Sequence, residues 1–148
     1  MVKGVRVTIL CLLLLLPFCG IKAQEKGFET DIHSNVRLVT MPIPEDMPSD
    51  FKAKYLLFLQ QLKDAIKAKT SERTAEDAFI FQVRPGIKEV GSTKTQRPMA
   101  SIVAYRKDSK NEYQGDILLY SYATGENISR EEIDKFLAKQ IINPLEKD

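Results

Sequence analysis

Residue types with distinctive chemistry are scarce in this chain, which has no tryptophan, one histidine and two cysteines among 148 residues. Both cysteines, Cys11 and Cys19, lie in an apolar N-terminal segment, and His33 lies in a polar stretch just after it. Removal of that segment excludes disulfides, thiolate nucleophiles and sulfur ligands. A zinc site would then need several carboxylates, and a Ser-His-Asp triad would depend on His33 alone. We therefore expect no metal, no cofactor and no catalytic residue set.

The first 23 residues have the three parts of a cleavable secretion signal. Lys3 and Arg6 give a positive start, residues 7–16 form an apolar run, and Ala23 is a small residue before Gln24. Such a run of ten residues rises about 15 Å as a helix, half of the roughly 30 Å hydrocarbon core, so it is too short for a good anchor. We expect cleavage after Ala23 and an exported protein, periplasmic or secreted, without a transmembrane span.

A lipid anchor at Cys19 is the competing interpretation of this segment. A lipobox requires a small residue before the cysteine, but Phe18 stands there, preceded by Pro17. The poor fit favours the cleavable signal.

The net charge of +2 changes when the signal is removed. Lys3, Arg6 and Lys22 are among the 22 basic residues, whereas all 20 acidic residues lie beyond the signal, which leaves the mature chain at about −1. Nucleic-acid binders need a basic excess concentrated on one face. We therefore expect no nucleic-acid partner.

Residues 24–34 are polar and predict a flexible lead-in, and residues 35–148 are long enough for a single domain with its own core. Alternating apolar and β-branched residues predict strands at 36–41, 78–84, 99–106 and 116–123. A polar turn over 107–115 joins the last two strands. Prolines punctuate an extended connector after the first strand.

Two helices are predicted. The first has Ser49 or Asp50 as its N-cap and runs to about Lys69, with an apolar stripe that Leu56 and Leu57 widen, so we expect it to be well covered. In the second, Ser129 and Glu132 have the spacing of a capping box. Pro144 is expected to end the second helix near Ile142. The order β-α-β-β-β-α predicts a two-layer α+β fold with a largely antiparallel sheet and both helices on one face.

Two regions are candidates for partner binding. The long loop expected at residues 85–98 carries Lys88, Lys94 and Arg97, and long loops in small domains are often binding elements. Tyr120 and Tyr122 share a face of the last strand, and Tyr105 on the neighbouring strand is expected to join them. This tyrosine face is a partner surface if the helices cover the other side of the sheet, and core if they cover this side, which we favour.

These features favour a non-catalytic binding or assembly protein of the cell envelope or periplasm that acts through contacts with a protein partner, such as an accessory subunit, an inhibitor or an immunity-type protein. One alternative is a small exported hydrolase that uses carboxylates among Asp108, Glu112 and Asp116, which requires two of them in one pocket. Another is a carrier of a small apolar ligand, which requires a cavity between the helices and the sheet.

Overall fold

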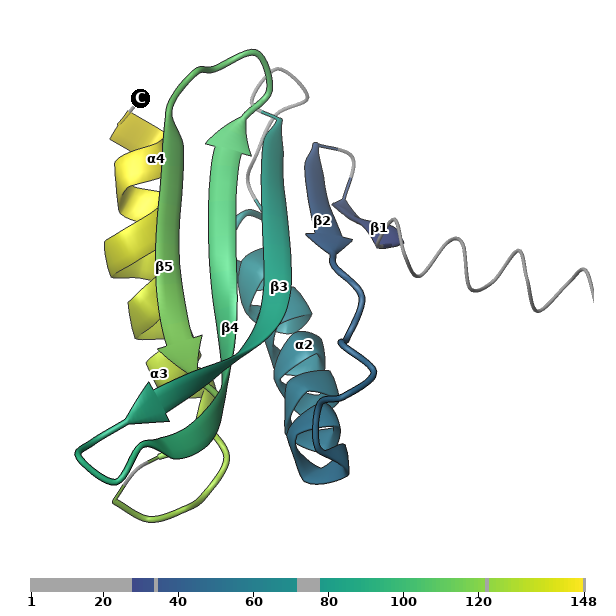
Figure 1. The fold of residues 1–148 in the computed structure, drawn as a ribbon. Coiled ribbons are helices and arrows are strands. Elements are labelled where there is room, and N and C mark those ends of the chain that lie inside the picture. Colours follow the sequence, from purple (N-terminus) through teal and green to yellow (C-terminus); the bar gives the residue numbers. More distant parts are fainter. Residues whose placement is uncertain (1–27, 34, 72–77, 122, 148) are drawn as a thin grey trace, which may run out of the picture.

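Five strands form one mixed sheet in the computed structural model, which describes residues 28–33, 35–71, 78–121 and 123–147. The elements are β1 (Phe28–His33), β2 (Val36–Thr40), α2 (Ser49–Lys69), β3 (Phe79–Val90), β4 (Thr95–Arg106), β5 (Glu112–Leu118), α3 (Arg130–Phe136), the π-helical segment η1 (Leu137–Ile142) and α4 (Asn143–Lys147). The helices lie together behind the sheet in the view of Figure 1. The predicted α+β fold, with a largely antiparallel sheet and the helices on one face, is confirmed.

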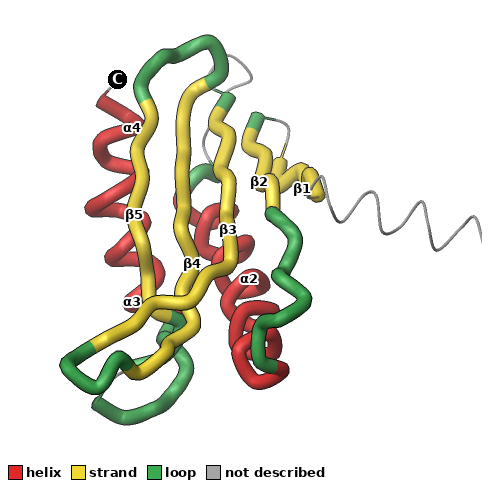
Figure 2. Tube along the Cα trace, in the orientation of Figure 1, coloured by secondary structure: helices red, strands yellow, loops and turns green. Residues whose placement is uncertain are grey.

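The strands lie in the sheet in the order of the sequence, β1-β2-β3-β4-β5. Neighbours are antiparallel except β2 and β3, which run parallel from Val36 opposite Phe79 to Thr40 opposite Val83. A parallel pair needs a long crossover connection, and helix α2 provides it. The pairing of β2 with β3 stops at Thr40 opposite Val83, because β2 ends there and β3 continues (Figure 2).

The sheet buries one face against the helices. Along β4, Ala100, Ile102 and Ala104 are buried, whereas Ser101 and Val103 between them are half-buried. Successive strand residues point to opposite faces, so this alternation is typical of a sheet that is covered on one side. The largest fully buried side chains, which form the centre of this core, are Tyr55, Phe58, Phe79, Phe81, Leu38, Leu62, Ile66, Ile102, Leu119, Ile133, Leu137 and Ile141.

Helix α2 begins at Ser49, the first of the two residues that were expected to cap it. Pro48 is the N-cap residue, no side chain caps the helix, and Ser49 is the first helical residue, so the predicted Ser49 or Asp50 cap is wrong. The predicted end at Lys69 is confirmed. Leu56 and Leu57 are 57% and 45% exposed, which corrects the expectation of a well-covered helix. At 3.6 residues per turn these two leucines lie beyond the arc that faces the sheet. None of the described helices is long and apolar enough to cross a membrane.

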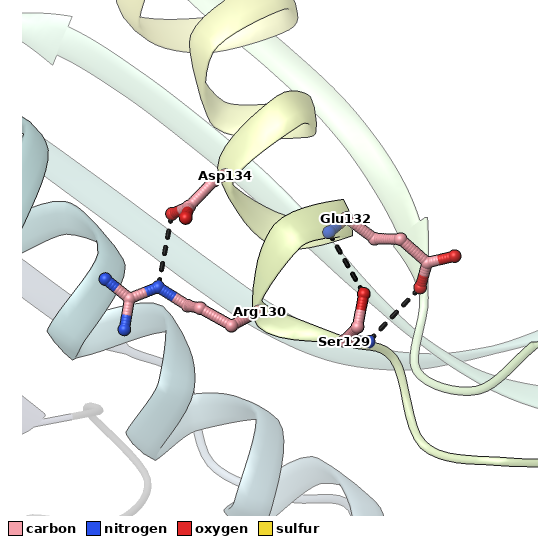
Figure 3. Close-up of polar contacts among 4 residues, drawn as sticks. All are labelled: Ser129, Arg130, Glu132 and Asp134. Carbon is pink, nitrogen blue, oxygen red and sulfur yellow. Dashed lines mark hydrogen bonds and ion pairs between the residues drawn. The ribbon is translucent and has the colours of Figure 1, made fainter.

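The capping box at the start of α3 is confirmed (Figure 3). The Glu132 backbone N–H donates to the Ser129 hydroxyl at 3.2 Å, and the Ser129 N–H donates to the Glu132 carboxylate at 3.2 Å. Arg130, the first residue of α3, forms an ion pair at 3.2 Å with Asp134, which lies one turn further along the helix. Two backbone donors at the helix start are thereby satisfied, which fixes where the C-terminal helix begins.

The C-terminal helix does not end near Ile142 as predicted, because it continues through α4 to Lys147. Proline in a regular α-helix collides with the carbonyl four residues earlier. Ahead of Pro144 the chain widens into the π-helical segment η1, where the Asn143 N–H donates to the Ala138 carbonyl five residues back. The wider turn accommodates Pro144 without ending the helix.

Two strand boundaries also differ from the prediction. Part of the expected flexible lead-in forms strand β1, which pairs with the outer edge of β2 from Phe28 opposite Thr40. Strand β5 covers Glu112–Leu118 and not residues 116–123, because a tight turn places Glu112 opposite Tyr105 and starts the strand early. Tyr120, which was expected on this strand, therefore lies beyond its end.

Candidate functional site

The long loop expected at residues 85–98 does not exist, because these residues extend β3 and β4 as a paired hairpin. The pairing continues to Val90 opposite Thr95, and a turn over residues 91–94 closes it. Gly91 and Lys94 have positive φ values of 80° and 52° in that turn. We call residues 85–98 the β3–β4 arm, since their strand pairing is with each other, beyond the ends of β2 and β5 (Figure 1). At the base of the arm, the Leu119 N–H donates to the Pro98 carbonyl at 3.0 Å.

Pro85 is tolerated inside β3 because of where β2 ends. The Phe79 N–H and the Val83 carbonyl both bond the β2 side, to Asn35 and Met41. Backbone groups alternate sides along a strand, so the nitrogen of Pro85 faces the same side, two residues beyond the last of these bonds. No described strand adjoins β3 at that point, and the missing N–H therefore costs no ladder bond. The sequence alone does not reveal this open edge.

At the base of the arm, two cations lie over one aromatic ring. The guanidinium carbon of Arg97 lies 5.0 Å from the centroid of the Tyr120 ring, and the Lys54 amine lies 5.2 Å from the same centroid. The Lys54 amine also donates to the Asn127 side-chain oxygen at 3.1 Å. Arg97 is 8% exposed. Three segments distant in sequence, namely α2, β4 and the chain after β5, are thereby joined at this point.

The structure brings together some of the predicted partner-binding residues. Lys88 is exposed and lies opposite the buried Arg97, and Lys94 is exposed in the turn. Tyr120 joins this group through Arg97. The amine of Lys54, which sequence reasoning did not connect with this region, completes the arm base.

The predicted tyrosine face does not form as one stripe. Tyr105 lies eight residues from Arg97 along β4, about 26 Å away, and its hydroxyl accepts a hydrogen bond from Gln82 at 3.3 Å. Tyr120 follows the end of β5 and is half-buried, and Tyr122 lies outside the described residues. Tyr105 and Tyr120 therefore do not share a face, either as an exposed partner surface or as part of the core.

The carboxylates considered for hydrolysis are spread along the turn and strand. Asp108 sits in the turn after β4 with φ 67°, and Glu112 and Asp116 are exposed on β5. The last two are four residues apart, about 13 Å, which exceeds the separation of paired glycosidase carboxylates. Asp116 accepts a hydrogen bond from Ser101 at 2.7 Å. Among the described residues, no three His, Cys, Asp or Glu side chains gather as potential metal ligands.

A second candidate site lies where β2 leads into α2. A cavity of about 250 Å³ opens between the connector and the helix. Its lining residues are Thr40, Met41, Pro42, Ile43, Tyr55, Leu56 and Leu59. None of them carries a charge. We call this the β2–α2 pocket. The sequence did not predict it, because its walls come from two segments, the proline-rich connector and α2, that meet only in the folded protein.

Tyr55 is the unusual member of this lining. Its side chain is 1% exposed, and its hydroxyl is buried with no hydrogen-bond partner among the described residues. Burial raises the pKa of the hydroxyl well above its ordinary value, so the group stays neutral. A buried hydroxyl without a partner costs about 1–3 kcal/mol. The apolar spacing of α2 placed Tyr55 on the buried stripe but gave no sign of its unsatisfied oxygen.

Comparison of the chain with protein-family models, curated proteins and solved structures found no match. The two candidate sites must therefore be interpreted from their own geometry and chemistry.

Proposed function

We propose that this protein is an exported, non-catalytic binding protein of the cell envelope or periplasm that acts through contacts with a protein partner. The β3–β4 arm is the contact surface in this proposal. The observation that carries it is the paired hairpin beyond the ends of β2 and β5, with Arg97 held against Tyr120 at its base. A hairpin in this position presents side chains to a partner from a fixed support.

The charge of the arm indicates the chemistry of its partner. Lys88, Lys94 and Arg97 are basic, and Glu89 is the one acidic residue among residues 85–98. Ile87 adds an apolar side chain that is 41% exposed. Complementary charge speeds association and selects partners, whereas aromatic and arginine side chains often supply most of the binding energy. We therefore propose a partner with an acidic surface beside a small apolar contact.

Co-purification with matched charge variants tests this contact. The tagged full chain is expressed in its native host, cross-linked, and recovered from the envelope fraction for quantitative mass spectrometry. We expect one envelope protein in near-equal amount with the wild type. The Lys88→Glu/Lys94→Glu variant should recover at least tenfold less of this protein than the wild type does, because the charge reversal turns attraction into repulsion.

The matched control is Lys67→Glu/Lys139→Glu, which makes the same change of charge at exposed helix positions away from the arm. This control should recover the partner as the wild type does. Equal recovery with the arm variant, or recovery of the protein alone, contradicts the proposed contact.

Export is tested separately. We expect the protein in the periplasmic or secreted fraction, with Gln24 as the mature N-terminus. A cytoplasmic protein that keeps Met1 contradicts the export proposal, and a lipid-modified N-terminus at Cys19 replaces it with the anchored alternative.

A further inference from the structure

The outer edge of β3 in the arm carries backbone groups that pair with no described strand. The Met41 N–H donates to the Val83 carbonyl at 2.9 Å on the β2 side of β3. Backbone groups alternate sides along a strand, so the N–H and carbonyl groups of Ile87 and Glu89 point to the same side. β2 has ended at Thr40, and β3 continues beyond its end (Figure 1). Ile87 and Glu89 are exposed, and such an edge is a template for pairing with another strand.

Two features make this open edge short. Pro85, the first outward-facing residue beyond Val83, has no N–H to donate. The turn at residues 91–94 ends the edge on the other side. Proline and short length are devices by which proteins limit aggregation at sheet edges. The edge therefore accepts a short extended segment opposite residues 86–90, and not a long strand.

The side chains along the open edge divide into a basic face and an apolar face. Arg84 and Lys88 are exposed and lie on one face, with Gly86 between them. Gly86 has no side chain, so a residue opposite it has room to approach both cations diagonally. Ile87 lies on the other face and is 41% exposed. Glu89 follows it on that face, beside the turn.

These two faces determine the chemistry of a segment that fits the edge. Opposite charges across paired strands are favourable, and like charges are unfavourable. Acidic residues opposite Gly86 and Lys88 therefore suit the basic face, and an apolar residue between them covers Ile87. A second arm does not fit in this way, because two-fold pairing centred on Lys88 places the two lysines opposite each other.

We propose that the open edge of the arm binds an extended segment of the partner protein by strand addition. The segment has the pattern acidic, apolar, acidic. Its main chain bonds the backbone of Ile87 and Glu89, and its acidic side chains pair with Arg84 and Lys88. This inference rests on the proposed protein contact through the arm and specifies how that contact is made.

Two capped peptides probe the segment. Their sequences are Thr-Thr-Glu-Val-Glu-Thr-Thr and the same sequence with lysine in place of glutamate, and both read the same in either direction, so both strand orientations are tested. In NMR titrations of the isotope-labelled protein, the glutamate peptide should bind at least about tenfold more tightly than the lysine peptide. The Arg84→Glu/Lys88→Glu variant should reverse this preference. The matched control Lys67→Glu/Lys139→Glu, with the same change of charge on the helices, should keep it.

Amide hydrogen exchange distinguishes strand addition from contact through side chains alone. With saturating glutamate peptide, the amides of Ile87 and Glu89 should exchange at least about tenfold more slowly, because they become hydrogen-bonded. The Lys88 amide faces β4, where Lys88 pairs with Arg97, so its exchange should not change.

An absence of saturable binding, equal affinities for the two peptides, or binding that leaves Ile87 and Glu89 unprotected overturns strand addition. Protection of both amides without peptide, in a protein that sediments as a dimer, overturns it as well, because a second copy then occupies the edge. Co-purification judges the proposed function separately. If Lys88→Glu/Lys94→Glu loses the envelope partner but the wild type does not bind the glutamate peptide, the arm binds through its side chains and not through its edge.

Discussion

Strands β2 and β3 are paired in parallel, but the chain continues beyond their paired segment in opposite ways. After Thr40 it forms a proline-rich connector that runs beside α2 (Figure 1) and leaves a pocket lined by uncharged residues. After Val83, opposite Thr40, it stays extended and forms a basic arm with β4. The local sequence decides this difference. Pro42, Pro44 and Pro48 remove donors over a whole segment, whereas Pro85 removes one donor at an edge where β3 has lost its neighbour.

The two regions also differ in the contacts that their side chains make with aromatic rings. In the arm base, Arg97 and Lys54 both lie over the ring of Tyr120. Beside the pocket, the buried hydroxyl of Tyr55 has no hydrogen-bond partner among the described residues. The contacts of Arg97 and Lys54 with the Tyr120 ring contribute to stability, whereas the buried hydroxyl of Tyr55 lowers it. The following predictions test this contrast, from the largest expected effect to the smallest.

Arg97→Ala should have the largest effect on stability. The substitution removes a buried side chain from the Tyr120 ring, and we expect it to lower the free energy of unfolding by about 2 kcal/mol. Lys88→Ala, at the exposed position opposite it, should change that free energy by less than about 0.5 kcal/mol. Urea denaturation of both variants measures the difference. Equal losses would contradict a special contribution of Arg97, because the exposed residue of the same cross-strand pair would then matter as much.

Alkaline pH should lower the stability of the protein through the buried hydroxyl of Tyr55. Burial raises the pKa of this hydroxyl in the folded protein. Below the ordinary pKa near 10 the group is neutral in both the folded and the unfolded protein, so its titration does not affect stability there. As the pH rises above 10, the unfolded chain ionises first, and the free energy of unfolding falls. At pH 11 this effect amounts to about 1.4 kcal/mol. Denaturation of wild type and Tyr55→Phe between pH 9 and 11 isolates the effect as a difference. Parallel stability curves for the two proteins would contradict a raised pKa.

Tyr55→Phe should stabilise the protein at neutral pH by about 1 kcal/mol. The variant removes a buried oxygen that has no partner among the described residues and leaves the packed ring in place. Thermal or urea unfolding of wild type and variant measures this gain. A loss of 1 kcal/mol or more would mean that the hydroxyl forms a bond in the folded protein.

Lys54→Met should have the smallest effect. It keeps most of the apolar stem but removes the charge beside Tyr120 and the hydrogen bond to Asn127, which we expect to cost about 0.5 kcal/mol. Lys63→Met on the same helix is the control and should be neutral. If the control has the same effect, the change reflects helix charge and not the arm base.

Local patterns predicted much of this fold. The apolar spacing from Tyr55 to Ile66 located α2, the residues at Ser129 and Glu132 located the start of α3, and the alternation along β4 identified its buried face. Each of these signals is contained in a few neighbouring residues. They were sufficient to predict the α+β class and the one-sided packing of the sheet.

The prediction failed where a residue's role depends on distant neighbours. Pro85 is accepted because β2 ends at Thr40, and Pro144 is accepted because η1 widens the helix before it. The early start of β5 moved Tyr120 out of the expected stripe and next to Arg97. The β2–α2 pocket has no local signal, because its walls meet only when the connector packs on α2.

Co-purification from the native envelope with three tagged proteins tests the central claim most directly, namely that the arm, and not the pocket, makes the protein contact. The proteins are the wild type, the arm variant Lys88→Glu/Lys94→Glu and the pocket variant Ile43→Trp. We predict that the wild type and the pocket variant retain the same envelope partner and that the arm variant loses it. Loss of the partner with the pocket variant, or its retention with the arm variant, would contradict the assignment of the protein contact to the arm.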